Sequence, residues 1–179
     1  MENTFRPAPT RSLPGAAAAG YAAFASFVIL TVLFAGVIPA AGPHPAPALL
    51  FTLAVVGVAF HVALFPVVAA LPAPDWGKAA GYGWLVIDIA TNVMGINGVA
   101  DGTTTAMRLG GHIAAAMWIA SAAAQARGRT RLVGLGLATA LAAYSFVAPW
   151  TGFMGFLPAI MLMIVWLWLS ARRLGATGL

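Results

Sequence analysis

The chain has 179 residues, of which 61% are apolar and only 7% are charged, whereas about a quarter of the residues of soluble globular proteins are charged. So few charges cannot cover a surface that faces water, so the composition excludes a soluble domain and places the chain in a lipid bilayer. The net charge is +5. The sequence contains no cysteine, so it excludes disulfides, iron–sulfur clusters and thiolate metal sites.

Long apolar runs decide which membrane architecture the chain adopts. A bilayer admits helices or a closed barrel, and a transmembrane helix needs about 20 consecutive apolar residues to cross a ~30 Å core. We therefore predict an all-α polytopic membrane protein, a six-transmembrane-helix bundle over 13–170 with cytoplasmic tails at 1–12 and 171–179. In chain order the helices are expected at 13–41, 48–71, 78–100, 106–125, 132–148 and 153–170. The first run is too long for a cleaved signal and is expected to stay as a helix.

The basic residues give an independent test of this topology, because cytoplasmic loops are enriched in lysine and arginine. With both ends inside, eight of the nine basic residues fall on the cytoplasmic side, and Arg108 alone lies outside. Their dispersal over four segments argues against a nucleic-acid surface. Abundant alanine, glycine, proline and arginine indicate a GC-rich bacterial genome, so we expect the inner or plasma membrane. The eight are Arg6, Arg11, Lys78, Arg127, Arg129, Arg131, Arg172 and Arg173.

Polar side chains at membrane depth are costly, so each is a candidate functional residue. At ~1.5 Å per residue, His61 and Asp88 fall near the middle of the membrane, Asn92 and His112 lie nearer the outside, and Arg108 lies at the outer rim. One stripe of the third predicted helix must face protein or a cavity, because lipid would leave its carboxylate unpaired. This stripe consists of Gly81, Trp84, Asp88, Asn92 and Gly95.

Several roles can be weighed for these polar groups. Haem held by His61 and His112 is disfavoured, because their depths differ by about 10 Å and one iron needs both imidazoles at one level. His61 and Asp88 form either a proton relay or a hydrogen-bonded pair that only sets helix register, and the sequence leaves both open. Asn97 and Asp101 lie near a helix end and fit caps better than ligands. No hydrolase, metalloprotease, phosphate-loop or magnesium motif is present.

Small residues recur every four positions on two helices. Gly111 and Ala115 mark such a stripe on the fourth predicted helix, and Gly134, Ala138 and Ala142 mark one on the fifth. Small residues let helix backbones approach closely in lipid. We expect either a tight pair of these two helices or a homo-oligomer contact.

Short motifs between about residues 50 and 145 resemble the Insig family, the six-helix membrane proteins that sense sterols. They are Gly-Ile-Asn at 95–97, Leu-Phe-Pro at 64–66, Trp118 in the fourth helix, and Gly-Leu-Gly at 134–136 after a loop rich in arginine. The chain departs from the family pattern at 98–100, where Gly-Val-Ala replaces His-Ala-Ser, and around 125–127, where the family has an aspartate. In the animal proteins that aspartate region supports binding to the partner Scap.

The resemblance implies a non-catalytic bundle that holds a membrane lipid, such as a sterol or a diacylglycerol-like molecule, in a cavity between its helices. The expected ligand-binding residues are His61, Trp84, Asp88, Asn92 and Asn97. A membrane-protein partner is a further expectation, and no cofactor or metal is expected. Two other functions stay open: a small transporter or proton-coupled carrier that uses His61 and Asp88, and a membrane-embedded enzyme acting on a lipid or isoprenoid with Asp88 as general acid.

Overall fold

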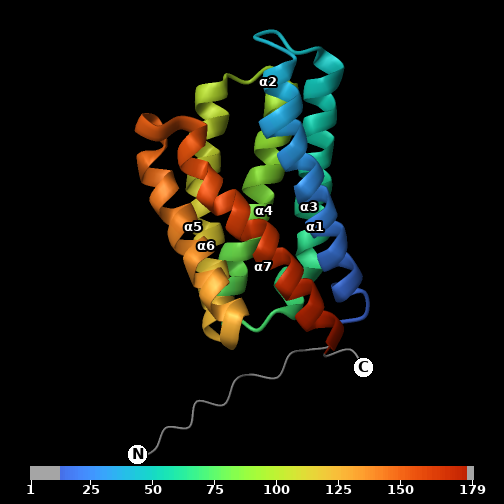
Figure 1. Ribbon diagram of the computed structural model, residues 1–179, viewed down its shortest axis with the longest axis vertical. Helices are drawn as coiled ribbons and strands as arrows, with labels where there is room; N and C mark the ends of the chain where they lie inside the picture. Colours follow the sequence, from blue (N-terminus) through green and yellow to red (C-terminus); the bar gives the residue numbers. More distant parts are fainter. Residues whose placement is uncertain (1–12, 177–179) are drawn as a thin grey trace, which may run out of the picture.

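The computed structural model describes residues 13–176, and every regular element among them is helical (Figure 1). The predicted tail at 1–12, with Arg6 and Arg11, lies outside the described residues. A π-helical segment, η1 (Leu33–Val37), joins α1 to α2, and a 3-10 segment, η2 (Gly152–Phe156), joins α6 to α7. The α-helices are α1 (Ala16–Val32), α2 (Ile38–Ala40), α3 (Pro47–Ala70), α4 (Asp75–Ile96), α5 (Asp101–Ala124), α6 (Gly128–Thr151) and α7 (Leu157–Ala176).

The helices are arranged as a closed ring. Each of α3 to α7 packs against its neighbour in the chain, and α1 packs against both α3 and α7. Figure 1 shows α1 in blue beside α7 in red, so that segments from the two ends of the chain close the ring. The connections at 71–74, 97–100 and 125–127 are short, and short connections make successive helices antiparallel. A ring of this kind encloses an interior that every long helix can line.

Length and apolar content allow four helical segments to cross a membrane, which agrees with an integral membrane protein. They are Ala16–Ala40, Pro47–Ala70, Asp75–Ile96 and Gly128–Ala176, the last of which contains α6, η2 and α7. Helix α5 is not among them, because glycines, threonines, Arg108 and His112 dilute its apolar residues. Two of these polar residues, Arg108 and His112, line the internal cavity described below.

Each predicted helix overlaps one helical segment, but several helix ends differ from the predicted ones by three to six residues, and two of these differences are instructive. Helix α4 begins at Asp75, directly after Pro74, and an acidic residue in the first turn is favoured by the helix dipole. Helix α7 continues to Ala176, into the segment predicted as a tail. Arg173, near its end, donates a hydrogen bond to the carbonyl oxygen of Gln125 at 3.3 Å. The helix therefore continues beyond the apolar run that ends at residue 170. Backbone hydrogen bonds determine how far a helix extends, whereas the membrane thickness determines the length of the apolar run.

The small residues allow close helix contacts within the chain. Helices α5 and α6 pack together, as one of the two alternatives predicted, and a Cβ added at Gly134 would lie 2.7 Å from the Cβ of Ala123. Gly111 faces α4 instead, where an added Cβ would lie 3.2 Å from Ile87 and 3.3 Å from Asp88. Glycine at these positions brings α5 close enough to α4 and α6 for polar side chains to meet across the interfaces.

Candidate functional site

A buried carboxylate, Asp88, organises the polar side chains inside the ring. Its exposed fraction is 4%, and its Oδ2 accepts a hydrogen bond from Trp84 Nε1 at 2.7 Å, one helical turn away. The Nε2 of His61, on α3, lies 3.0 Å from the same oxygen. The structure therefore brings together His61 and Asp88, which the sequence analysis had considered as a pair.

The His61 ring also constrains the protons of this pair. Its Nδ1 lies 2.7 Å from the carbonyl oxygen of Gly57, which can only accept, so Nδ1 carries a hydrogen. The 3.0 Å contact between Nε2 and Asp88 Oδ2 then needs a second hydrogen between the two atoms. The pair therefore holds one exchangeable proton, written either as imidazolium with carboxylate or as neutral imidazole with carboxylic acid.

The other carboxylate oxygen, Asp88 Oδ1, is buried and has no hydrogen-bond partner among the described residues. Arg108 Nε lies 3.9 Å away, at ion-pair distance. The guanidinium is positioned from α4, because Arg108 Nη2 donates to Thr91 Oγ1 at 3.2 Å and to Asn92 Oδ1 at 3.3 Å. Asn92 in turn donates from Nδ2 to the carbonyl oxygen of Asp88 at 2.8 Å. Oδ1 is thus an acceptor near one cation, whose Nε lies too far away for a hydrogen bond.

His112, four residues after Arg108 on α5, adds a second unpartnered polar atom. Its ring is 7% exposed and stacks on Phe156 with ring centroids 5.2 Å apart and an angle of 12° between the planes. Its Nδ1 is buried without a hydrogen-bond partner in the described part of the chain. An unpaired buried polar atom costs ~1–3 kcal/mol, so a ligand that pairs with it has free energy to gain.

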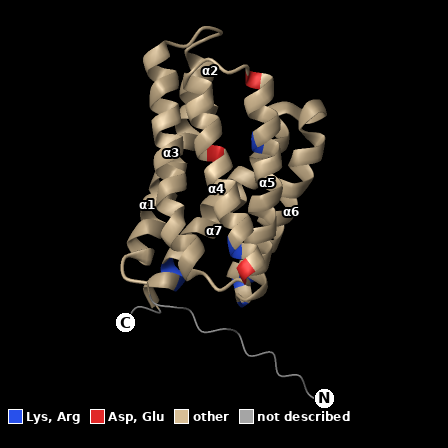
Figure 2. Cartoon of the chain, turned by 180° about the vertical axis from the view of Figure 1, so that it is seen from behind, with Lys and Arg blue, Asp and Glu red and all other residues tan. Residues whose placement is uncertain are grey.

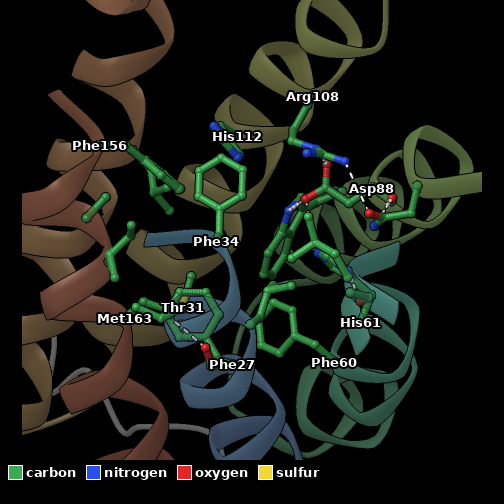
Figure 3. Close-up of a pocket in the computed structure, with 18 residues that line it drawn as sticks. Phe27, Thr31, Phe34, Phe60, His61, Asp88, Arg108, His112, Phe156 and Met163 are labelled. Atoms are coloured by element: carbon green, nitrogen blue, oxygen red, sulfur yellow. Dashed lines mark hydrogen bonds and ion pairs between the residues drawn. The ribbon is translucent and has the colours of Figure 1, made fainter. Parts of the chain in front are cut away.

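These groups line an internal cavity of about 150 Å³, which we call the inner cavity. Every long helix of the ring contributes to its lining. In Figure 3, Asp88, Arg108 and His112 lie on one side of it, and Phe27, Thr31, Phe60 and Met163 lie toward the opposite end. Asp88, Arg108 and His112 therefore lie in one part of a wall that is otherwise mostly apolar, and the Thr31 hydroxyl at the other end donates to the carbonyl oxygen of Phe27 at 2.8 Å. The apolar lining is Phe27, Leu30, Phe34, Leu53, Phe60, Leu141, Phe156, Ala159, Ile160 and Met163.

Four of the five predicted ligand-binding residues lie together at this cavity. His61, Trp84, Asp88 and Asn92 all line it. Asn97 does not, because it is the exposed C-cap residue of α4, and its Nδ2 donates to the carbonyl oxygen of Val93 at 2.8 Å. The end-of-helix role weighed for Asn97 from the sequence is the one the structure gives it.

Arg108 and His112 belong to the site although they were not among the predicted ligand-binding residues. Counting residues along a helix placed Arg108 at the outer rim, but this count locates the Cα atom and not the end of a long side chain. The guanidinium reaches across to α4, where it contacts Thr91, Asn92 and Asp88. The available signal was that Arg108 is the one basic residue outside the cytoplasmic segments of the predicted topology.

No set of three or more His, Cys, Asp or Glu residues in the described range could hold a metal ion. The chain was also compared with protein-family models, curated proteins and solved structures. None of these comparisons gives a match.

Proposed function

We propose that this chain is a non-catalytic membrane protein that binds a lipid inside its ring of helices. The observation that carries this proposal is the inner cavity, with its mostly apolar wall and its unpaired Asp88 Oδ1 and His112 Nδ1 on one side. Apolar contact supplies most of the affinity in such a cavity, and a few polar groups select orientation. Binding acts by favouring one packing of the ring over others.

The proposal includes the topology. Six long helical segments, from α1–α2 to α7, each cross the membrane of a bacterial cell, with both ends of the chain in the cytoplasm. Figure 2 shows basic residues gathered toward the end of the bundle opposite α2, and one basic residue partway along α5. Arg108 is the one lysine or arginine in the sequence of α5. This asymmetry is what the enrichment of positive charge on the cytoplasmic side would produce. The outer end is then the one that carries α2 and the connection at 97–100.

The resemblance to Insig proteins supports the same function. A ring of six helices around an internal cavity suits a lipid sensor such as an Insig protein, and the ligand would be a sterol, a diacylglycerol-like molecule or another amphiphile. A membrane-protein partner or a second copy of the chain would read out the bound state. Neither partner is needed to form the inner cavity, because all of its lining residues come from one chain.

Native mass spectrometry of the purified protein tests lipid binding directly. We expect one lipid per chain to survive gentle removal of detergent, and Asp88→Ala to lose it. A matched control is Asp101→Ala, which removes an exposed carboxylate from the first turn of α5 without touching the cavity. Absence of any lipid of defined mass from the parent protein would contradict the proposal, and conversion of an added lipid would favour the enzyme instead.

A proton-coupled carrier is the second candidate, and one observation favours it. The contacts of His61 with Gly57 and Asp88 require a proton held between two side chains that line a cavity. Buried acid–base pairs of this kind occur on proton paths in transporters. Protein in liposomes containing a pH-sensitive dye tests this function. Proton flux that disappears in Asp88→Asn would support a carrier, and an unchanged dye signal with the parent protein would exclude proton conduction.

A further inference from the structure

The inner cavity is too small to enclose a whole membrane lipid. Its volume is about 150 Å³, whereas cavities for drug-sized ligands measure ~300–1,000 Å³. If the proposed lipid binding is correct, on which this inference rests, most of the ligand must extend beyond the inner cavity. The direction in which it extends determines where along the ligand its polar group lies.

A second cavity of about 390 Å³, the outer cavity, shares part of its wall with the inner one. Phe34, Arg108, His112 and Phe156 line both cavities. Two of these four residues belong to the irregular segments, since Phe34 lies in η1 and Phe156 in η2. Beyond this shared wall the outer cavity is mainly apolar. Its remaining lining is Thr105, Leu109, Tyr144, Ala148, Pro149, Gly152 and Phe153.

Polar groups are concentrated where the two cavities meet. Arg108 and His112 are part of the shared wall, and Asp88 Oδ1 lies 3.9 Å from Arg108 Nε. The two unpartnered polar atoms of the site, Asp88 Oδ1 and His112 Nδ1, both belong to this region. This polar layer thus lies between the mainly apolar outer cavity and the apolar end of the inner cavity, which is lined by residues such as Phe27, Phe60 and Met163. A ligand with its polar group at one end would satisfy this layer and fill only one chamber.

We propose that the two cavities form one bipartite site for an amphiphile that has a single hydroxyl group in the interior of an apolar molecule. The hydroxyl donates to Asp88 Oδ1 and accepts from the Arg108 guanidinium, so both halves of the hydroxyl are paired. The smaller apolar part of the ligand occupies the inner cavity, and the larger part occupies the outer cavity.

Two positional isomers, 1-hexadecanol and 8-hexadecanol, test this inference with defined probes. The two isomers have the same molecular formula and partition similarly into detergent micelles. They differ only in whether the hydroxyl group is terminal or internal. Binding to the detergent-purified full chain is measured from the shift in thermal unfolding with probe concentration. We expect half-saturation by 8-hexadecanol at about tenfold lower concentration, because only this isomer fills both chambers while it pairs with Asp88.

Arg108→Met tests the polar layer, because it keeps an apolar stem and removes the donor. We expect it to reduce the isomer preference to about twofold or less, whereas Arg172→Met, an exposed position on α7 outside both cavities, keeps the full preference. Equal affinity for the two isomers, or tighter binding of 1-hexadecanol, would overturn the bipartite site and leave lipid binding intact. Failure of both alcohols to bind a protein that retains a copurified lipid would also overturn the inference but not the proposed function.

Discussion

Asp88 links three side chains through one carboxylate. Oδ2 meets both Trp84 and His61, and Oδ1 faces Arg108. Trp84 and His61 are also buried, and Asp88 is the one side chain in the described part of the chain that hydrogen-bonds to either of them, so both would lose that bond if the carboxylate were removed. The residue therefore has a structural role as well as a proposed role in ligand binding, and the two must be separated by experiment.

We expect Asp88→Ala to lower the free energy of unfolding by on the order of 3 kcal/mol, because it leaves buried donors on Trp84 and His61 unpaired. Asp88→Asn keeps one oxygen that can accept from Trp84, so its loss should be about half as large. Thermal unfolding of both variants in the same detergent measures the difference. If both variants were as stable as the parent protein, the hydrogen bonds of Asp88 would add no net stability.

His112 offers the opposite case, a buried group whose loss should not weaken the fold. His112→Phe keeps an aromatic ring against Phe156 and removes the unpartnered Nδ1. We expect unchanged stability or a gain of up to about 1 kcal/mol, together with weaker lipid retention. Chemical or thermal unfolding and native mass spectrometry report the two effects separately. His44→Phe, in the exposed connection before α3, serves as the control, and a clear loss of stability in His112→Phe would contradict this role.

Much of the site could be predicted from residue spacing, because helix rise sets the depth of each Cα atom. That reasoning correctly paired His61 with Asp88 across two helices. It could not place Arg108, whose guanidinium lies far from its own Cα, nor the Phe34 and Phe156 side chains, which depend on the irregular segments η1 and η2. Spacing along a regular helix carries no information about where the backbone becomes irregular.

At the scale of the helix, α6 presents two glycines with contrasting surroundings. A Cβ at Gly134 would lie 2.7 Å from Ala123 Cβ and 2.8 Å from Trp166 Nε1, whereas a Cβ at Gly136 would meet only Leu162 Cδ1 at 3.7 Å. The two positions are separated by one residue on the same helix, but Gly134 is buried and Gly136 is exposed. They form a matched pair for measuring what close helix approach contributes.

We expect Gly134→Ala to destabilise the protein by about 1–3 kcal/mol, because α5 and α7 would have to move away from α6. Gly136→Ala should be neutral or stabilising by up to ~1 kcal/mol, since alanine favours a helix over glycine where space allows. Unfolding of the two variants side by side measures both values. Equal effects at the two positions would show that α6 tolerates outward movement, contrary to the close packing seen here.

The helix positions could be predicted well because apolar runs and prolines mark them, but the helix ends could not. Helix α6 includes Pro149, and α3 includes Pro66, although proline removes a backbone donor. A proline in an apolar run therefore does not by itself end a helix in this chain. Near the end of α7, Arg173 donates to the carbonyl oxygen of Gln125, the C-cap residue of α5, and no local pattern reveals such a contact.

For the whole molecule, the absence of cysteine makes the proposed topology directly testable. His44→Cys lies in the exposed connection before α3, and Arg129→Cys lies in the exposed first turn of α6. We expect a membrane-impermeant maleimide to label His44→Cys in intact cells. The same reagent should label Arg129→Cys only after the cells are permeabilised. Labelling of Arg129→Cys in intact cells would contradict the proposed orientation.

The contact between α1 and α7 has a consequence for biosynthesis. Gly20 on α1 lies against Ala171 on α7, where an added Cβ would be 3.0 Å from the alanine Cβ. While the chain is being translated, the first helix must wait in the bilayer until the last one has left the ribosome. During that interval the interior of the incomplete ring is open to acyl chains, so the site can acquire its first lipid as the nascent protein closes around it.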